Sequence, residues 1–404
     1  MFKFLKKVAE NQAVHPSASW LSLDIPRTDF DYSKEVGTGL GSSVIMSPVQ
    51  WIMRTFPESP VRMEKVDGDD IEKISEHPFL NMINNPNPFY TYETMMMATL
   101  MSWNIAGNAY WIKVRSKMGE VLELWYVPHW MMTPKGSDAD PSIFIDHYIY
   151  NPNGVPYRIE IEDVVHFRFG LNPENIRMGI SPLDSVIREV FTDDEAGNYS
   201  ASILRNMGVP SVIISPSSND VDISQEQAKV IKEKFTQSFA GDNRGQALVM
   251  TGSTKVDTFG FDPKQLSLSD IRNISEERVC ACLGIPAAVV GFGSGLEATK
   301  VGATMTAMIK LAWTGNIIPS QRIIAQVITK QLLIDFDDND DLDVVFDNSR
   351  IVALQEDKSE KIRRLTDGVK SGWVRISEVR QAEGLPIDES DEIYLRPLNL
   401  VEIE

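Results

Sequence analysis

The chain has 404 residues, of which 43% are hydrophobic and 24% charged, so its composition is that of a globular protein and excludes wholesale disorder. At roughly 150 residues per domain, this length accommodates two or three domains. Lys and Arg number 39 against 57 Asp and Glu, which gives a net charge of -18. This balance argues against a broad surface that grips nucleic acid through its phosphates, but it allows nucleic acid to slide past.

The residues that usually carry chemistry are sparse. Cys280 and Cys282 are the two cysteines, which excludes a disulfide scaffold and fits a reducing compartment. The acidic run at 335–341 lacks the glycine and the final glutamate of a calcium loop. The five histidines are His15, His77, His129, His147 and His166, and none of them belongs to a metal-ligand spacing or a nucleophile motif. His166 lies inside an expected strand and is interpreted as structural. We therefore predict no catalytic residue, no metal and no cofactor, and favour a structural or interaction protein over an enzyme.

Membrane and targeting signals are weak. The first eight residues carry the lysines of a signal peptide, but polar residues interrupt the apolar core that should follow. The longest uncharged run, 94–112, holds too many polar residues for a bilayer and predicts a buried helix that runs into a strand. We expect no membrane partner and a flexible N-terminal segment over 1–43. The alternative is a short peripheral anchor made of Phe2, Leu5 and Val8 with Lys3, Lys6 and Lys7.

The first half of the chain reads as α+β. Apolar residues recur at helical spacing over 44–54, and a second helix starts near Tyr92. Five strands are predicted after it, at 109–115, 121–128, 147–150, 158–161 and 164–169. Residues 151–154 have the composition of a hairpin turn.

A long helix is predicted from the N-cap Ser181 to about Met207. A second helix spans about 267–283. The segment between them predicts a small α/β unit, and the two helices resemble the legs of a stalk that carries it. The elements predicted in this unit are a strand at 211–215, a helix at 224–239, and strands at 246–250 and 255–259. The remaining predicted elements are helices at 298–312, 319–333, 353–370 and 377–383 and a strand at 342–346.

Glycines at 291, 293 and 295 resemble part of a dinucleotide-binding fingerprint. Leu296 stands where the last glycine of that fingerprint belongs, and no acidic residue follows in a strand. A mobile loop is the favoured interpretation. A cytosolic nucleotide-binding enzyme that uses the Gly291–Gly295 loop is the alternative.

Taken in order, several segments resemble the HK97-like portal proteins of tailed phages, and the resemblance runs from about Val44 to Pro397. They are Asn84-Asn85-Pro86-Asn87 with Ala106-Gly107-Asn108-Ala109-Tyr110; Leu124-Trp125-Tyr126-Val127-Pro128; Val164-Val165-His166-Phe167-Arg168 with Gly179-Ile180-Ser181-Pro182-Leu183; Leu283-Gly284-Ile285-Pro286; and Gly372 through Glu378-Val379-Arg380 to Gly384-Leu385-Pro386. Ser377 departs from the family, which often has Asn there, and only an altered helix cap is expected.

This resemblance implies an α+β portal fold that assembles as a ring. It implies a wing at 44–180, stem helix 1 at 181–208, a clip at 209–262, stem helix 2 at 263–285, a tunnel loop and tunnel helix at 286–316, a wing return at 317–350, and a helical crown with the C-terminal tail at 351–404. The implied job is a channel, usually a dodecamer in this family, at one capsid vertex of the virion, assembled in the host cytoplasm. Double-stranded DNA is packaged and later ejected through it without sequence specificity. The implied partners are copies of the same chain, the large terminase subunit, the head–tail adaptor, the major capsid protein and a scaffolding protein.

Three groups of site residues follow from this resemblance. The DNA tunnel is expected at Gly291, Phe292, Gly293, Ser294, Gly295, Lys300 and Lys310, where the alternative for both lysines is an ordinary ion pair between subunits. An acidic channel wall that repels phosphates is expected at Glu189, Asp193, Asp194 and Glu195. Contact between the clip and the terminase or adaptor is expected at Asp220, Asp222 and Glu226, although a solvated helix start is also acidic.

Overall fold

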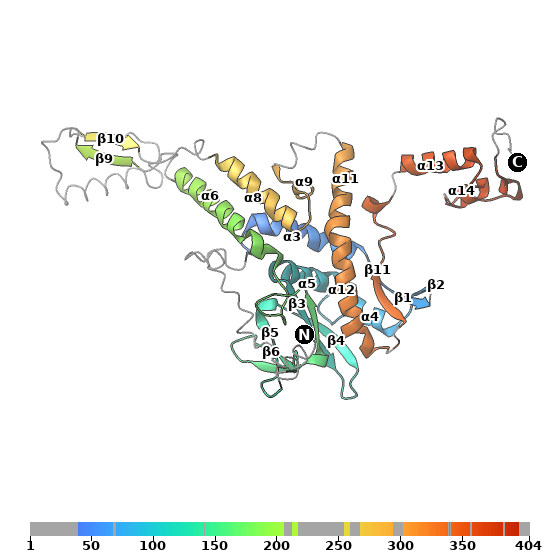
Figure 1. Cartoon of the computed structure of the whole chain (residues 1–404), viewed down its shortest axis with the longest axis horizontal. Helices are drawn as coiled ribbons and strands as arrows, with labels where there is room; N and C mark the ends of the chain where they lie inside the picture. The colour runs from blue at the N-terminus through green and yellow to red at the C-terminus, as the bar shows by residue number, and fades with distance from the viewer. Residues whose placement is uncertain are drawn as a thin grey trace, which may run out of the picture. The chain divides into compact units, whose positions relative to one another are not determined.

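A computed structural model describes residues 39–67, 70–140, 142–205, 212–216, 254–258, 267–293, 302–337, 339, 341–355, 358–382 and 384–395. Within this part the chain combines helices with small antiparallel sheets (Figure 1), which confirms the α+β class. It divides into two compact units, Met1–Asp347 and Asn348–Glu404.

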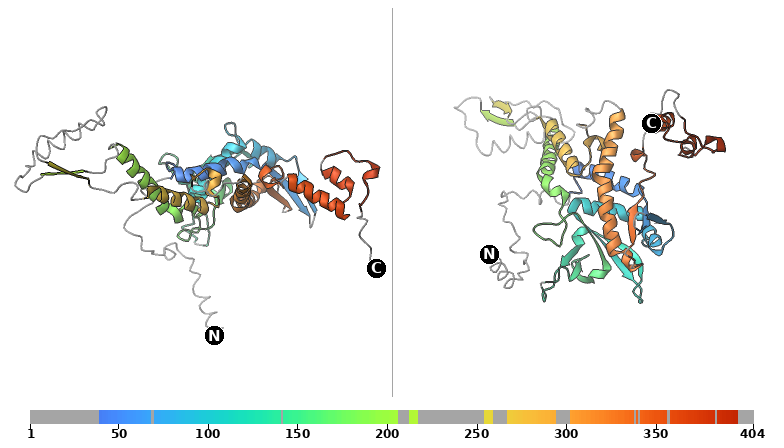
Figure 2. Two further views of the ribbon diagram at one scale, coloured as in Figure 1. Left: turned by 90° about the horizontal axis from the view of Figure 1, so that it is seen from above. Right: turned by 45° about the vertical axis from the view of Figure 1, so that its right-hand side comes forward.

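The centre of the first unit is an antiparallel sheet of order β4-β3-β8, made of β3 (Asn108–Arg115), β4 (Val121–Val127) and β8 (Val164–Arg168). Helix α5 (Tyr92–Ala106) covers one face, where the Trp111 indole N–H donates to Thr99 Oγ1 over 2.7 Å. A second sheet packs on the other face (Figure 2), formed by β5 (Met132–Lys135), β6 (His147–Tyr150) and β7 (Tyr157–Glu160). Because successive strand side chains alternate between faces, the core between the sheets is made of Tyr110, Val127, Met132, Tyr148 and Val164.

A third sheet joins segments far apart in the chain. Its order is β11-β1-β2, with β1 (Val61–Asp67), β2 (Asp70–Ile74) and β11 (Leu342–Phe346), and Met63 pairs with Val344. Two helices flank its first two strands in the chain, α3 (Ser43–Thr55) before β1 and α4 (Pro78–Asn84) after β2. The Phe56 and Phe346 rings meet edge to face with centroids 5.0 Å apart, which fixes the end of α3 on this sheet.

The next elements begin with a 3-10 turn, Pro182–Val186, followed by α6 (Ile187–Arg205). Ser181 caps this start as predicted, since its Oγ accepts the Leu183 N–H at 3.1 Å. The strands β9 (Val212–Pro216) and β10 (Thr254–Thr258) pair in antiparallel fashion, and α8 (Leu268–Cys282) returns along α6. Helices α9 (Ala287–Val290), α11 (Gly302–Ala312) and α12 (Ile318–Gln331) follow, and a π-helical segment, Trp313–Ile317, joins α11 to α12.

The second unit contains α13 (Lys358–Ser371) and α14 (Ile376–Ala382), with short 3-10 turns at Val352–Leu354 and Glu389–Asp391. The Glu378 carboxylate accepts the Arg375 N–H at 2.9 Å and so caps the first turn of α14. Ser377 lies inside α14 and is buried rather than at the cap position.

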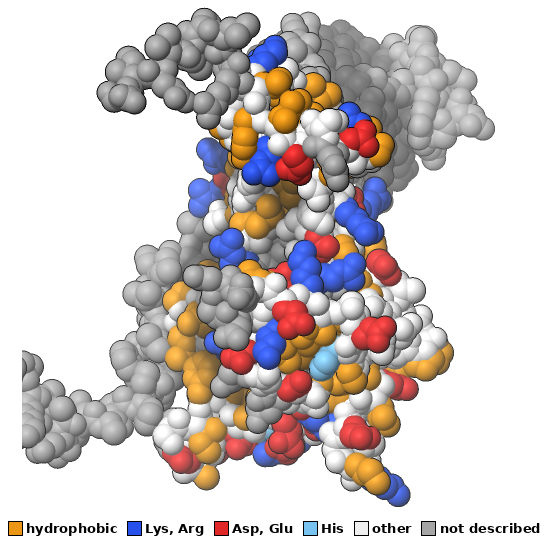
Figure 3. Space-filling view, turned by 90° about the vertical axis from the view of Figure 1, so that its right-hand side faces the viewer, with side chains coloured by type: hydrophobic (Ala, Val, Ile, Leu, Met, Phe, Trp, Pro, Cys, Tyr) orange, Lys and Arg blue, Asp and Glu red, His pale blue; other side chains and the backbone are white. Residues whose placement is uncertain are grey.

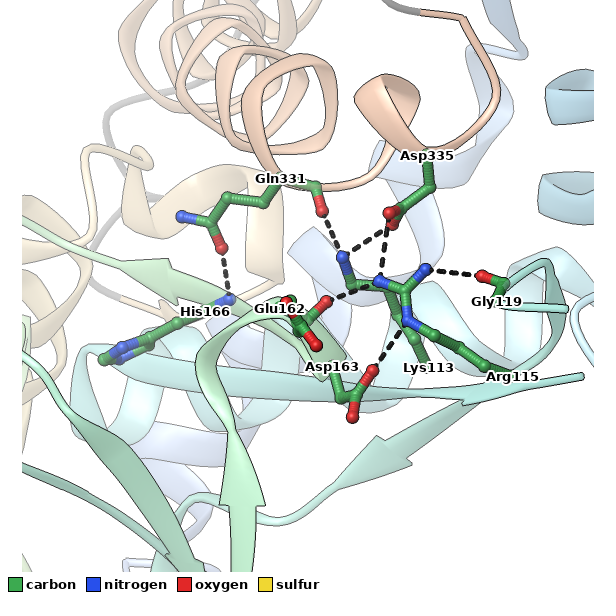
Figure 4. A network of polar contacts seen from close by, with 8 residues as sticks. All are labelled: Lys113, Arg115, Gly119, Glu162, Asp163, His166, Gln331 and Asp335. Atoms are coloured by element: carbon green, nitrogen blue, oxygen red, sulfur yellow. Dashed lines mark hydrogen bonds and ion pairs between the residues drawn. The ribbon is translucent and has the colours of Figure 1, made fainter. Parts of the chain in front are cut away.

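A buried ionic network ties the end of α12 to the central sheet (Figure 4). Lys113 Nζ, on a side chain that is 3% exposed, lies 2.7 Å from Asp335 Oδ2 and donates to the Gln331 carbonyl. Arg115 pairs with Asp335 Oδ1 at 2.9 Å and with Asp163 at 2.7 Å. One carboxylate therefore holds two cations from the same strand.

A second junction is made by backbone and amide groups. The Asn108 side chain accepts the Gly179 N–H at 2.7 Å and faces His166 Nε2 at 3.1 Å, while Tyr148 contacts His166 Nδ1. Since the Asn108 oxygen only accepts, this arrangement assigns the ring proton to Nε2. Burial lowers the pKa of His166 well below its usual value, so it is a neutral structural histidine, as predicted.

Several elements differ from the prediction. Strands β1, β2 and β5 and helix α4 were not predicted. The strands β2 and β5 and helix α4 are short, and β1 gains its partner β11 from residues about 280 positions later. The helix expected at 353–370 begins only at Lys358, after a short 3-10 turn. Part of the glycine-rich loop is helical, at α9. Residues 1–38 of the expected flexible segment, the helix at 224–239 and the strand at 246–250 lie outside the described residues.

Replacing Gly179 by Ala will destabilise the protein, because the new Cβ would lie 2.1 Å from the Gly107 carbonyl oxygen and 2.8 Å from the Phe169 nitrogen. We expect a loss of about 2–4 kcal/mol, measured as a lower Tm and denaturation midpoint. Gly197→Ala is the matched control. It lies within α6 with nothing within 4 Å of the new Cβ, and it should raise stability by up to about 1 kcal/mol. Equal effects of the two changes would contradict the close approach at Gly179.

Candidate functional site

Helices α6 and α8 form an antiparallel pair that carries the predicted acidic residues (Figure 1). Three contacts spaced along the pair set its register. Arg272 Nε lies 2.9 Å from Asp193 Oδ1, Arg278 pairs with Glu189, and Cys282 donates to the Pro182 carbonyl at 2.7 Å. The pair is therefore joined by ionic contacts in its middle and by a thiol hydrogen bond at its base.

Two of the four predicted wall carboxylates face α8. Asp193 is 4% exposed and is neutralised by Arg272, and Glu189 is half-buried against Arg278. Their charges join the two helices and are compensated within one protomer. The role of these two residues in a channel wall stays a prediction, but each already has a partner.

The other two acidic residues have different surroundings. Burial raises the pKa of the Asp194 carboxyl, Ser42 opposes this rise, and the charges of Asp193 and Glu195 add to it. Glu195 is exposed and accepts a hydrogen bond from the Asn198 amide at 3.2 Å. Consecutive helical residues are rotated by about 100°, so the run 193–195 points in three directions rather than lining one surface.

Glu276 is a site residue that the prediction missed. Its Oε2 atom is buried and has no hydrogen-bond partner in the described part of the chain. Burial raises the pKa of the Glu276 carboxyl, Arg272 opposes this rise and Asp193 adds to it. Two carboxylates thus compete for one guanidinium between α6 and α8. The i, i+4 spacing of Arg272 and Glu276 was the signal available in the sequence.

The predicted tunnel residues are only partly described. Helix α9 ends at Val290 and is capped by Gly291, whose φ of +89° is left-handed and suits glycine, and Phe292 N–H then donates to the Ala287 carbonyl. Lys310 is exposed in the last turn of α11. Ser294, Gly295 and Lys300 lie outside the described residues, as do the three predicted clip residues Asp220, Asp222 and Glu226.

The segment before this loop is anchored on the π-helical turn. A Cβ added to Gly284, whose φ is +68°, would lie 3.2 Å from the Gly315 carbonyl oxygen, and Asn316 Nδ2 donates to the Leu283 carbonyl at 2.6 Å. The chain that enters the predicted tunnel loop is therefore held against the α11–α12 rod. A dinucleotide fingerprint needs a strand before its glycines, whereas the helix α9 stands there, so this context does not favour the nucleotide-binding alternative.

No group of His, Cys, Asp and Glu in the described ranges is arranged to hold a metal ion. Within the same ranges, no helix combines the length and the apolar character needed to cross a membrane. On the face drawn in Figure 3, cationic and anionic side chains lie next to one another among small hydrophobic groups. That face therefore carries no broad patch of a single charge among its described residues.

Three comparisons bear on the identity of this arrangement. A sequence model of the family described as "Phage portal protein" matches residues 43–384. An uncharacterized protein of Rickettsia bellii (strain RML369-C) is 21% identical over 321 residues, which cover 78% of this chain and 80% of that protein.

Solved structures share the fold. A chain from the neck of a native gene transfer agent (GTA) particle, computed with C12 symmetry, gives a TM-score of 0.61 at 17% identity over 89% of this chain and 94% of that one. A chain from the neck of an empty GTA particle, computed with C6 symmetry, gives 0.62 at 19% identity, over 88% and 93%. An HK97-family phage portal protein from Corynebacterium diphtheriae gives 0.56 at 15% identity, over 78% and 95%.

The raised pKa of Glu276 has a testable consequence for stability. A carboxyl whose folded pKa is raised costs stability when it ionises, so this cost is absent below the ordinary value of 4.5 and appears as the pH rises through the folded pKa. Glu276→Gln should therefore raise the Tm at pH 7, and the difference from wild type should vanish near pH 4. Glu277→Gln, on an exposed position of the same helix, is the control and should change the Tm little at either pH. A Glu276→Gln variant that is less stable at pH 7 would contradict this account.

Proposed function

The chain belongs to the phage portal protein family, and from this we propose that it forms a ring-shaped channel at one vertex of a phage-like capsid, through which double-stranded DNA enters and leaves. The observation that carries the proposal is the family match over 43–384, supported by a fold shared with neck chains of GTA particles. One of those necks has C12 symmetry, and we propose twelve copies here. A portal acts as a conduit and docking ring, and we propose no enzymatic activity for this chain.

We assign the parts as follows. Residues 44–180 and 317–350 act as the wing, the helices within 181–208 and 263–285 as the stem, 209–262 as the clip, 286–316 as the tunnel loop and helix, and 351–404 as the crown. The antiparallel pairing of α6 and α8, with the paired strands β9 and β10 between them in the chain, supports the stem and clip assignment.

The negative net charge of the chain suits a channel through which DNA slides rather than a surface that binds DNA tightly. Twelve copies at -18 each carry about -216, and such a ring repels phosphates and keeps a duplex away from its wall. Glu195, exposed on α6, is the strongest of the four predicted wall residues, because Glu189 and Asp193 are paired with arginines. Lys310, exposed on α11, is the described cation proposed to touch the DNA backbone transiently, with Lys300 as a second.

The proposed partners follow from the same role. The clip, including Asp220, Asp222 and Glu226, would meet the large terminase subunit and later the head–tail adaptor. The major capsid protein would surround the ring at the vertex, and a scaffolding protein would assist assembly in the host cytoplasm.

Electron microscopy with native mass measurement tests the ring. We expect rings with an axial hole and a mass of about 545 kDa, twelve times the 45.4 kDa chain. Coexpression with the capsid protein is the matched condition for a chain that needs a partner to assemble. Compact monomers under both conditions, together with binding of a labelled nucleotide, would overturn the proposal in favour of the nucleotide-binding alternative.

Replacing Lys310 by Ala tests the tunnel assignment. We expect rings to form as in wild type while nuclease-protected DNA per particle changes at least about twofold, because one transient phosphate contact per subunit is lost around the ring. Lys330→Ala is the matched control, since Lys330 also lies in the last turn of its helix, α12. If Lys310→Ala packages as much DNA as wild type, or if both variants change packaging equally, the assignment of Lys310 to the tunnel is wrong.

A further inference from the structure

Two of the segments quoted for the family resemblance meet on the central sheet and form a partly exposed aromatic surface. Phe89 and Tyr90 come from the loop that follows Asn84-Asn85-Pro86-Asn87, and Trp125 lies on β4. The Phe89 and Trp125 ring centroids are 5.7 Å apart, and the Tyr90 ring meets Trp125 edge to face at 5.4 Å. Phe89 is nevertheless 78% exposed. We name Phe89, Tyr90, Trp125 and Glu123 the aromatic platform.

The platform is built on a fixed loop. Asn87 is buried, its amide donates to the Leu124 carbonyl at 2.8 Å, and its oxygen accepts the N–H groups of Phe89 and Tyr90 at 2.9 and 3.0 Å. The Leu124 N–H donates to the Pro86 carbonyl at 2.7 Å. These hydrogen bonds hold the loop in one conformation while the Phe89 side chain stays exposed. The loop is therefore pre-organised for contact, because little of its conformational entropy remains to be lost on binding.

The platform also carries a negative charge. Glu123 Oε2 accepts the Trp125 indole N–H at 2.8 Å, and in the described part of the chain this carboxylate pairs with no cation. Residues two apart on a strand share a face, so the carboxylate lies on the same side of β4 as the Trp125 ring. Val114, 40% exposed and opposite Glu123 in the register, extends the apolar surface.

The bonds to Pro86 and Asn87 also decide how a ligand can bind. Strand β4 is an edge of its sheet, but its Leu124 N–H and C=O groups are already occupied by the loop. A ligand cannot extend the sheet at that point, so it must be recognised through side chains. Aromatic faces beside a free carboxylate attract a cationic group flanked by apolar groups.

We propose that the aromatic platform binds the basic, apolar segment at the start of this same chain, Phe2-Lys3-Phe4-Leu5-Lys6-Lys7. In a chain of net charge -18, the first eight residues contain three lysines and no acidic residue, and they alternate these lysines with Phe and Leu. These lysines complement the negative charge of the platform, and the Phe and Leu side chains complement its aromatic surface. The ammonium groups meet the Glu123 carboxylate and the aromatic faces, and the apolar side chains cover Phe89 and Val114.

A long stretch of chain connects the segment to the described residues. The 31 residues from Val8 to Thr38 separate this segment from Gly39, the first described residue, and they can span up to about 100 Å when extended. The platform proposed to hold the segment is that of its own chain or of a neighbouring copy. The proposal depends on the platform and the segment and does not require ring formation.

Hydrogen exchange of the full-length protein, in whatever assembly it forms, tests the proposal. We expect the amides of residues 2–8 to be protected in wild type. Phe89→Ala should speed their exchange about tenfold, and Glu123→Gln about threefold, because glutamine keeps an acceptor for the indole but loses the charge. Met118→Ala is the matched control, since Met118 is a 90% exposed hydrophobic residue at the turn between β3 and β4 and lies outside the platform.

The outcomes separate the possible occupants. Phe89 and Met118 are both so exposed that their loss leaves the core intact, and an unchanged Tm verifies this. Residues 2–8 that exchange at the unprotected rate in wild type overturn the proposal, as does protection that neither platform variant reduces. Protection that appears only after addition of anionic lipid vesicles overturns it in favour of a membrane anchor. None of these results depends on whether rings form, so each is distinguishable from failure of the portal proposal.

Discussion

The carboxylate of Asp335 holds two cations of the central strand, and much of the first unit depends on this contact. A buried ammonium such as that of Lys113 is strongly unfavourable without a partner, so the chain must bring a carboxylate to it. Asp335 comes from the turn after α12, more than 200 residues later, and it also binds Arg115. The pairing fixes the end of α12 on β3, and α12 is joined through the π-helical segment to α11. This buried charge cluster therefore acts with the hydrogen bonds from His166 to Gln331 and from Val344 to Thr329 to set the position of α12 on the sheets, and through α12 that of the proposed tunnel helix.

The segments that carry the family resemblance are places where distant parts of the chain touch. Gly107 and Asn108 meet Gly179 and His166, Asn87 meets Leu124, and Gly284 meets Gly315. These contacts use glycines, amides, carbonyls and the neutral structural histidine His166, and they hold distant segments together. This explains why a search for catalytic motifs in the sequence found almost nothing while the order of segments was informative. In such a protein the distinctive residues maintain the fold.

Local patterns in the sequence were sufficient for the elements with a strong apolar period or a clear cap. The strand at 342–346 was predicted to the residue, and the start at Ser181 and the two helices now seen as α6 and α8 were also predicted. Contacts between elements were not accessible in the same way. Nothing local to β1 indicates that its partner is β11, and nothing local to Asp193 indicates that Arg272 neutralises it. The run Asp193-Asp194-Glu195 suggested one acidic surface, whereas the rotation of the helix sends its three side chains into three surroundings.

The negative field of the α6–α8 pair comes from an excess of carboxylates over guanidinium groups rather than from any single residue. The two helices contain seven carboxylates against four guanidinium groups, and two of those carboxylates are committed to the Glu189–Arg278 and Asp193–Arg272 pairs. In the proposed channel, the uncompensated charge is what would act on the DNA, and three of the carboxylates that carry it are exposed: Glu195, Asp270 and Glu277. Repulsion from a wall needs only a net field of one sign and tolerates variation in which residues supply it. In the proposed channel, the best-placed carboxylates can therefore join the helices, because the remaining negative charge is enough to repel the phosphates.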